Sequence, residues 1–388
     1  MKKILYVTGK LPDNRIINDG GDSTVAEYIN ALGKDNELDL LLIRTDVDTV
    51  NDIPNVRNII KIKRDMLRRN NFGKTDSSKY TEWISGGEII AKAVRELEYG
   101  YDIIIMQHIS CALGLNVNDE KILRKTVLMP MFTGKFYLMA GEYVPDIYIQ
   151  REKAVLPLIR NILSPGLAEK RVLVDEYGVD ECRITVIPRA VRFPYIHREH
   201  ADKTCTKLLY IGSVRSQKNH IGAVCMMRHL LRYNRNIKLL CCGAIQERSI
   251  YETCKAQINE YDLTEHIIFC GNQSSEKIGS IIHGCDINIS VSNCETFGRG
   301  VYEGMAAGLP TVILSRPYCE VQTDNISVHP LIAADYEDMA SIISYLSQND
   351  NAYSIESQKG LILQKELSPE LISGRIRSTV TALPEFNS

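Results

Sequence analysis

The chain has 388 residues, 44% of them hydrophobic and 24% charged, and its net charge of −2 argues against a nucleic-acid-binding protein, which is usually basic. No run of about 18 apolar residues occurs, so we expect no transmembrane helix. The N-terminal stretch MKKILYVTGKLPD has only a short apolar run, and we interpret it as a strand rather than a signal peptide. The length predicts two or three domains.

The chain has 11 cysteines, an odd number, and none of them forms a Cys-x-x-Cys motif. Cys241, Cys242 and Cys270 lie in apolar, strand-like runs, where a free cysteine behaves as a small buried hydrophobic residue. The sequence therefore favours reduced thiols and a cytoplasmic protein.

Short apolar runs alternate with longer helical patterns in both halves of the chain. In the first half the expected strands are 2–9, 38–45, 101–108, 125–130, 160–166 and 183–191. In the second half they are 207–214, 237–244, 266–271, 286–292 and 310–315. Apolar strands separated by amphipathic helices are typical of parallel sheets covered on both faces. The pattern predicts an α/β protein with two doubly wound, Rossmann-like domains facing each other across a cleft.

The polar stretch RFPYIHREHADKTCT, residues 192–206, marks the expected boundary between the domains. We expect an N-terminal domain over 1–195, a linker over 196–206 and a C-terminal domain over 207–365. Residues 366–388 have a helical pattern and are expected to pack against one of the two domains. One alternative is that this segment crosses back to the N-terminal domain.

The stretch NCETFGRGVYEGMAAGLP follows the strand expected at 286–292. Gly298 and Gly300 permit close approach of a ligand to the backbone, and the helix that starts near Arg299 favours anions at its first turn. A carboxylate such as Glu303 can accept two hydrogen bonds from a vicinal diol. Glu295 precedes the helix, where a second polyol could lie.

Either acid alone is more simply explained as a solvated surface residue. The segment Gly-Met-Ala-Ala-Gly-Leu-Pro that follows argues against this, because a helix of small residues is suited to tight packing on a sheet. A nucleotide carrying a sugar would satisfy both the glycines and the two acids.

The stretch ETFGRGVYEGMAAGLPTVI resembles the Glu–seven residues–Glu signature of retaining glycosyltransferases of the family 4 type (glycosyl transferases group 1), which have the GT-B fold. Three further segments resemble the family's motifs in the family's order: DEYGVDECRITVIPRAV, KLLYIGSVRSQKN and HIIFCGNQSSEKIGSIIHGCDINISVS. The resemblance is clearest over about residues 160–345.

This resemblance implies roles for particular residues of the C-terminal half. Glu303 would bind the ribose of the nucleotide, Glu295 would contact hydroxyls of the donor sugar, and Lys218 would neutralise the diphosphate. The family usually has arginine where this chain has Ser213, and Arg215 is a candidate replacement because a guanidinium can bind a phosphate through two donors. The remaining expected donor contacts come from Phe297, Gly298, Arg299 and Gly300.

In the N-terminal half, Gly20 and Gly21 precede an amphipathic helix and resemble the family's glycine loop. His108 lies near the place where the family often has an active-site histidine, and Gln107 matches that place equally well by spacing. For the glycine pair and for a histidine at a strand end, a purely structural role stays open.

Residues 57–74 are rich in lysine and arginine. A solvated helix and loop is the simpler interpretation, and a patch for an anionic acceptor or a membrane surface is the functional one. Phe72, Tyr80 and Trp83 could supply aromatic rings for such a surface or for stacking on a sugar.

Together these features predict a metal-independent enzyme without a cofactor that transfers a hexosyl group from a nucleotide diphosphate sugar to an acceptor hydroxyl. By the resemblance, UDP is the preferred nucleotide, glucose or N-acetylglucosamine the preferred sugar, and the anomeric configuration is retained. We expect a cytoplasmic protein, with peripheral membrane contact as one alternative, that builds a polysaccharide or glycolipid and binds no nucleic acid. Three alternatives stay open: glycosylation of a small natural product, a nucleotide-sugar epimerase and a non-catalytic nucleotide-binding protein.

Overall fold

The computed structural model describes residues 1–10, 20–44, 52–63, 77–197, 205–317 and 326–382. No helix within these ranges has the length and apolar character needed to cross a membrane. The chain divides into two compact units. Unit 1 comprises Met1–Leu138, Glu142–Pro188 and Ile372–Ser388, and unit 2 comprises Met139–Gly141 and Arg189–Leu371.

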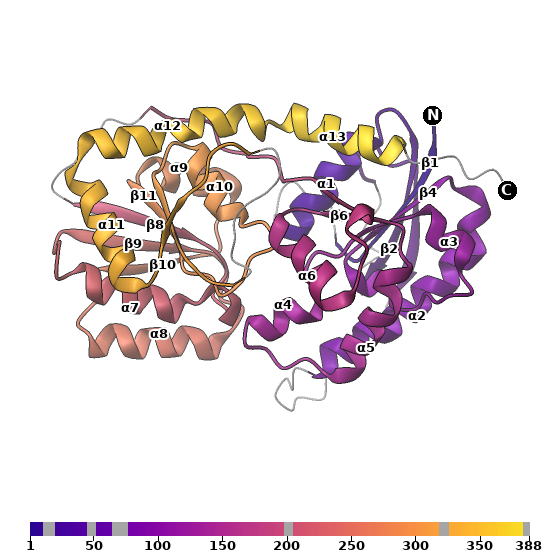
Figure 1. Ribbon diagram of the computed structural model, residues 1–388, viewed down its shortest axis with the longest axis horizontal. Helices are drawn as coiled ribbons and strands as arrows, with labels where there is room; N and C mark the ends of the chain where they lie inside the picture. The colour runs from indigo at the N-terminus through magenta and orange to yellow at the C-terminus, as the bar shows by residue number, and fades with distance from the viewer. Residues whose placement is uncertain (11–19, 45–51, 64–76, 198–204, 318–325, 383–388) are drawn as a thin grey trace. The chain divides into compact units, whose positions relative to one another are not determined.

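Unit 1 is built on a parallel sheet that has seven strands within the described residues, in the order β3-β2-β1-β4-β5-β6-β7 (Figure 1). The strands are β1 (Lys3–Thr8), β2 (Glu37–Arg44), β3 (Asn58–Lys63), β4 (Ile103–Gln107), β5 (Thr126–Met129), β6 (Asn161–Ser164) and β7 (Ile184–Val186). The helices are α1 (Gly20–Leu32), α2 (Ser77–Leu97), α3 (Glu120–Lys125), α4 (Gly134–Met139), α5 (Asp146–Val155), α6 (Leu167–Tyr177) and, for its larger part, α13 (Pro369–Thr381).

Unit 2 has a six-stranded parallel sheet within the described residues, in the order β10-β9-β8-β11-β12-β13. Its strands are β8 (Thr206–Ile211), β9 (Ile237–Cys242), β10 (Ile267–Gly271), β11 (Ile287–Ser290), β12 (Thr311–Leu314) and β13 (Leu331–Ala333). Its helices are α7 (His220–Leu230), α8 (Arg248–Glu260), α9 (Ser275–His283), α10 (Arg299–Ala306), α11 (Tyr336–Gln348) and α12 (Asp350–Glu366).

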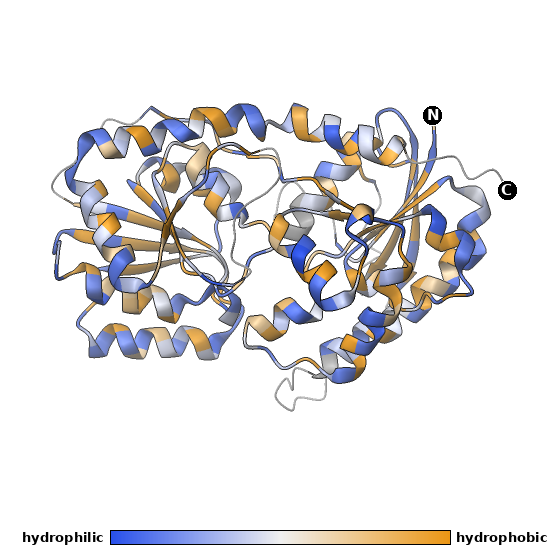
Figure 2. Cartoon of the chain, viewed as in Figure 1, coloured by the Kyte–Doolittle hydropathy of each residue, from blue (hydrophilic) through white to orange (hydrophobic). Residues whose placement is uncertain are grey.

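Both faces of the unit 2 sheet are buried. Leu208 and Tyr210 of β8 belong to the larger core, which includes residues of α7, α8 and α11, whereas Leu209 between them belongs to a second core with residues of α9 and Phe193. Successive residues of a strand point to opposite faces, so a strand covered on both sides is apolar throughout. Figure 2 shows this pattern as largely hydrophobic strands flanked by helices in which hydrophobic and hydrophilic residues alternate. The predicted fold of two doubly wound α/β domains is confirmed.

The interpretation of the basic segment 57–74 as a solvated helix and loop is wrong for the part that the structure describes. Residues Asn58–Lys63 form β3, which pairs in parallel with β2 from Asp39↔Asn58 to Arg44↔Lys63. Lys61 and Lys63 are exposed on this edge strand. Lysines on an edge strand oppose pairing with another chain, which explains a basic strand at this place. The short edge strand β13 was also not predicted.

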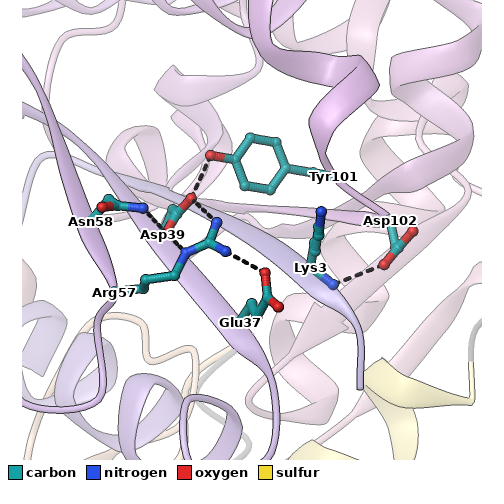
Figure 3. A network of polar contacts seen from close by, with 7 residues as sticks. All are labelled: Lys3, Glu37, Asp39, Arg57, Asn58, Tyr101 and Asp102. Atoms are coloured by element: carbon teal, nitrogen blue, oxygen red, sulfur yellow. Dashed lines mark hydrogen bonds and ion pairs between the residues drawn. The ribbon is translucent and has the colours of Figure 1, made fainter.

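A polar network lies at the amino-terminal edge of the unit 1 sheet (Figure 3). The Asp39 carboxylate, 3% exposed, accepts hydrogen bonds from Arg57 Nε at 2.9 Å and Nη2 at 2.7 Å, from Asn58 Nδ2 at 3.0 Å and from the Tyr101 hydroxyl at 2.8 Å. Arg57 also pairs with Glu37. Arg57 is thus part of a structural network rather than of a free basic surface.

The strand orders fix where ligands can bind in each unit. In each sheet the strand that comes first in the chain, β1 or β8, lies inside the sheet, and the chain adds later strands first on one side of it and then on the other. In open α/β sheets ligands bind beyond the carboxyl ends of the strands at the point where this strand order reverses. In unit 2 the relevant loops follow β8 and β11, and both contain residues singled out from the sequence.

Candidate functional site

The loops after β8 and β11 are joined by hydrogen bonds. Asn293 N donates to the Gln217 carbonyl oxygen at 2.8 Å, and Gln217 Nε2 donates to the Cys294 carbonyl oxygen at 3.0 Å. Asn219, whose φ of 51° and ψ of 49° are left-handed, accepts from Gly222 N at the start of α7 and donates to the Val291 carbonyl oxygen. These bonds hold the two loops in one fixed arrangement.

Lys218 and Glu295 are brought together by this arrangement. Lys218 Nζ forms an ion pair with Glu295 Oε1, which also accepts from the Ser292 hydroxyl at 2.7 Å. The stem of Lys218 lies over Gly212, where a Cβ would come within 3.1 Å of Lys218 Cδ. Both side chains are largely buried, with 16% and 8% exposure, so each has lost most of its water and depends on the other for charge compensation.

Helix α10 begins beside Glu295 in the chain, at Arg299, as the sequence predicts. Its N-cap, Gly298, has a φ of 76°, a conformation in which only glycine is unstrained. Gly300 lies against β8, where a Cβ would be 2.7 Å from the Ile211 carbonyl oxygen, so this glycine permits close packing on the sheet. The ring of Phe297 is buried and stacks on Tyr302 at 4.8 Å, which leaves its backbone as the part that could meet a ligand.

Glu303 lies one turn into α10 and is 1% exposed. Arg192 Nε donates to Glu303 Oε1 at 2.5 Å and Arg192 Nη2 donates to Oε2 at 3.0 Å. Sequence reasoning missed Arg192. The two residues are 111 positions apart, and no local signal connects an arginine after the strand expected at 183–191 with an acid in this helix.

Arg215 and Ser213 lie in the same loop as Lys218. Arg215 Nη2 donates to Gln217 Oε1, so in this structure the guanidinium braces its own loop. Ser213 follows Gly212 beyond the end of β8, where Gly243 packs so closely that a Cβ on it would be 2.2 Å from the Gly212 carbonyl oxygen. His220 follows the same loop but carries no charge. Burial and, to a smaller extent, the charge of Lys218 lower the pKa of His220 to about 3, so the ring is neutral. Positive charge in this loop therefore comes from Lys218 and Arg215.

In unit 1, the two alternatives at the end of β4 differ clearly. Gln107 is buried and accepts hydrogen bonds from the Tyr6 hydroxyl at 2.9 Å and the Thr8 hydroxyl at 3.3 Å, as a structural residue does. His108 is half-buried and has a φ of 79° and a ψ of 136°, which are strained for any residue except glycine. Backbone strain of this kind is common at functional sites, which favours His108 over Gln107.

The His108 ring is fixed by its neighbours. Its Nδ1 accepts from Ser110 N at 3.2 Å and lies 2.8 Å from the Ser110 hydroxyl, and its ring centroid is 4.9 Å from that of Trp83. Because Nδ1 accepts from a backbone amide, the neutral ring carries its proton on Nε2. Tyr80, suggested from the sequence as a ring for a surface or for stacking on a sugar, is fully buried and packs edge-on against Trp83 and Tyr148.

The other residues expected in unit 1 are only partly described. Gly20 and Gly21 are the first residues of α1. Of the proposed basic patch, residues 64–74, with Phe72 among them, lie outside the described residues.

Comparison with known proteins bears on the family and the fold. Residues 194–360, most of unit 2, match the model of the family described as glycosyl transferases group 1. No curated protein sequence matches the chain.

Several solved structures are similar over nearly the whole chain. Sucrose-phosphate synthase from Thermosynechococcus elongatus has a TM-score of 0.74 and 16% identity, covering 99% of this chain and 100% of the other. Anabaena HepE in complex with UDP-glucose has a TM-score of 0.69 and 14% identity, covering 98% and 100%. WaaG, a glycosyltransferase involved in lipopolysaccharide biosynthesis, has a TM-score of 0.69 and 11% identity, covering 97% and 99%.

The chain therefore has the GT-B fold. The resemblance to glycosyl transferases group 1 is confirmed for residues 194–360, which include Lys218, Glu295 and Glu303.

Proposed function

We propose that this protein is a retaining glycosyltransferase that transfers a hexosyl group from a nucleotide diphosphate sugar to an acceptor hydroxyl. UDP is the proposed nucleotide, and glucose or N-acetylglucosamine the proposed sugar. The observation that carries the proposal is the Lys218–Glu295 ion pair, formed where the loops after β8 and β11 meet, immediately before the N-terminus of α10.

In the proposed reaction the bond between the sugar C1 and the diphosphate oxygen breaks, a bond from C1 to the acceptor oxygen forms, and the proton of the acceptor hydroxyl passes to the departing diphosphate. The departing diphosphate gains negative charge. Lys218 supplies a positive charge and the first amides of α10 supply aligned dipoles, and such preorganised groups stabilise a developing anion. Arg215 is a second cation within the same loop. Because these groups can neutralise the diphosphate, we propose that turnover needs no metal ion.

Glu295 and Glu303 are assigned to different parts of the donor. Glu295 precedes α10 and is anchored by Ser292 and Lys218, so its second oxygen is proposed to bind hydroxyls of the sugar. Glu303 is proposed to bind the ribose. Glu295 lies in the loop before α10 and Glu303 lies within the helix, so we do not assign them as an acid–base pair on one face of the helix.

For unit 1 we propose that His108 and the amides at Gly20 and Gly21 belong to the site of transfer. Trp83 and Phe132, half-buried rings close to the carboxyl ends of β4 and β5, are suited to an acceptor that presents the face of a sugar. A glycan or a lipid-linked sugar would present such a face, and we propose an acceptor of this class and a cytoplasmic reaction.

The direct test is to follow UDP-glucose by proton NMR in the presence of purified protein and a chelator, without acceptor. The proposal predicts slow release of UDP together with glucose whose first-formed anomer is α, and faster loss when a glycan acceptor is added. Conversion of the donor to an epimeric UDP-sugar would identify an epimerase. Binding of UDP-glucose with no reaction, even with acceptors, would identify a binding protein and overturn the proposed activity.

A further inference from the structure

The carboxylate of Glu303, to which the proposed function assigns the ribose, is already occupied. Both of its oxygens accept from the Arg192 guanidinium, at 2.5 Å from Nε and at 3.0 Å from Nη2. Two parallel bonds of this kind occupy the outward-facing edge of a carboxylate. A vicinal diol that approaches the same edge, with one hydroxyl to each oxygen, therefore competes with the guanidinium.

Arg192 is presented by a segment that is fixed to unit 2, residues 189–197, which we call the strap. Val191 N donates to the Leu367 carbonyl oxygen at 3.0 Å, and Ile196 N donates to the Ala307 carbonyl oxygen at 3.3 Å. Between them, the Phe193 carbonyl oxygen accepts from Gln364 Nε2 at 2.7 Å. The strap backbone is thus bound on both sides of Arg192, to the residue that follows α10 and to residues at or near the end of α12.

The two members of the pair differ in exposure. The side chain of Glu303 is 2% exposed, whereas that of Arg192 is 28% exposed. The guanidinium therefore lies on the solvent side of the carboxylate, with its Cζ 5.5 Å from the centroid of the Phe193 ring. Displacement of the guanidinium towards water requires a change in its own side chain and none in the strap backbone. Separation of the pair leaves Glu303 buried without a partner, which is costly unless another donor takes its place.

We propose that Arg192 is a latch on the nucleotide site: it satisfies Glu303 when no ligand is bound and is displaced by the two ribose hydroxyls when a nucleotide binds. This inference rests on the proposed function and deepens it. Because the nucleotide must break an existing ion pair, the latch lowers its affinity. It also makes binding depend on a ligand that offers two neighbouring hydroxyls, since a single hydroxyl cannot replace both bonds.

The opposite role is physically reasonable and gives the opposite sign. If Arg192 stayed in place and merely oriented Glu303 for the ribose, any loss of the two-point contact would weaken nucleotide binding. The sign of the change in affinity therefore decides between a latch and a positioning residue.

The experiment is titration calorimetry with UDP and 2′-deoxy-UDP on the full chain. The informative variant is Arg192→Lys, which keeps the positive charge but can make only one strong bond to the carboxylate at a time. The latch predicts UDP binding tightened by at least about threefold, with a much smaller change for 2′-deoxy-UDP. Arg248→Lys is the matched control, because Arg248 forms an ion pair with Glu252 on the surface of the same unit and is 88% exposed. It should bind both ligands like the wild type.

Two further variants guard against misfolding and indirect effects. Arg192→Met, checked by urea unfolding, should also bind UDP more tightly if it folds. In a Glu303→Gln background, Arg192→Lys should no longer change UDP affinity. UDP affinity in Arg192→Lys that is equal to or weaker than in the wild type overturns the latch while leaving the proposed function intact. If neither wild type nor variants bind UDP, GDP or ADP, the proposed function fails and the latch fails with it.

Discussion

Lys218 and Glu295 form a largely buried ion pair although 77 residues separate them in the chain. The pair exists because β8 and β11 are neighbours in the sheet, so the loops after these strands meet at its carboxyl edge. A cation that can receive a diphosphate and an acid that can receive a polyol are thus held against each other before any ligand arrives.

Replacement of Lys218 by methionine should reduce both turnover and stability. We expect the rate of UDP-glucose consumption to fall by roughly 10²- to 10³-fold, because a charge aimed at the leaving group is lost. The free energy of unfolding should fall as well, by about 3 kcal/mol, because Glu295 is left buried without its cation.

The double variant Lys218→Met with Glu295→Gln separates the two effects. Urea unfolding should show most of the stability restored, since no unpaired charge remains, while turnover stays low. A double variant that regains wild-type turnover would show that Lys218 serves only to neutralise Glu295.

His108 offers a prediction about backbone strain. Its φ of 79° penalises every side chain with a Cβ, so His108→Gly should be more stable than His108→Ala. We expect a difference of about 1 kcal/mol, because the strain relieved, about 1–3 kcal/mol, exceeds the extra entropy that glycine loses on folding. Urea unfolding of the two variants measures it. An alanine variant as stable as the glycine variant would mean that the strain is absent in solution.

The network around Asp39 predicts how stability depends on acid pH. Burial alone would raise the pKa of Asp39, but hydrogen bonds from Arg57, Tyr101 and Asn58 outweigh it and lower the pKa below its usual value of 3.8. The folded state therefore binds this proton less readily than the unfolded state, so the stabilisation is complete above about pH 4 and is lost as the pH falls through the lowered pKa.

Asp39→Asn should accordingly lower the free energy of unfolding by about 2 kcal/mol at pH 7, because the charge-assisted bonds are lost. Denaturant unfolding as a function of pH should show the gap between variant and wild type narrowing below pH 4. A gap that is constant from pH 7 down to the lowest pH at which both chains fold would contradict this account.

Glu152 predicts the opposite slope in the neutral range. Burial raises the pKa of Glu152 to about 8, although the Tyr177 hydroxyl and the Gly134 amide donate to its oxygens. The folded state then holds a proton that the unfolded chain has released above about pH 4.5, so this residue makes stability fall as the pH rises from about 4.5 to 8.

The Glu152→Gln variant has no titratable group at this position, so it should lack this dependence of stability on pH. Relative to the wild type, the variant should gain stability as the pH rises from 5 to 8, by up to a few kcal/mol. Thermal unfolding at matched ionic strength measures the difference. Parallel curves for the two chains would show that Glu152 is ionised in the folded protein throughout this range.

The fold could be predicted because it depends on local patterns. Eleven apolar runs matched strands to within a few residues, and the start of α10 at Arg299 followed from Gly298 and the change of pattern after β11. The strand β3 was missed because Ile59, Ile60 and Ile62 alternate with lysines, and a charge-rich edge strand has the composition of a solvated segment.

The candidate site was predicted in part, and the division has a physical cause. Glu303 and Glu295 lie in one continuous motif, which can be read locally. Their partners come from elsewhere: Lys218 depends on the pairing of β8 with β11, and Arg192 on the path of the strap along α10. Contacts between residues far apart in sequence follow from topology and packing, so local patterns in a single sequence do not predict them.

The central claim is that unit 2 binds a nucleoside diphosphate through Glu303, and thermal shift with UDP, GDP and ADP tests it most directly. A ligand present at 100 times its dissociation constant adds about 2.7 kcal/mol to the folded state. We predict a rise of several degrees in the Tm of the wild type with one of the three, UDP being expected, and a much smaller rise in Glu303→Ala. No rise in the wild type with any of them would contradict the account.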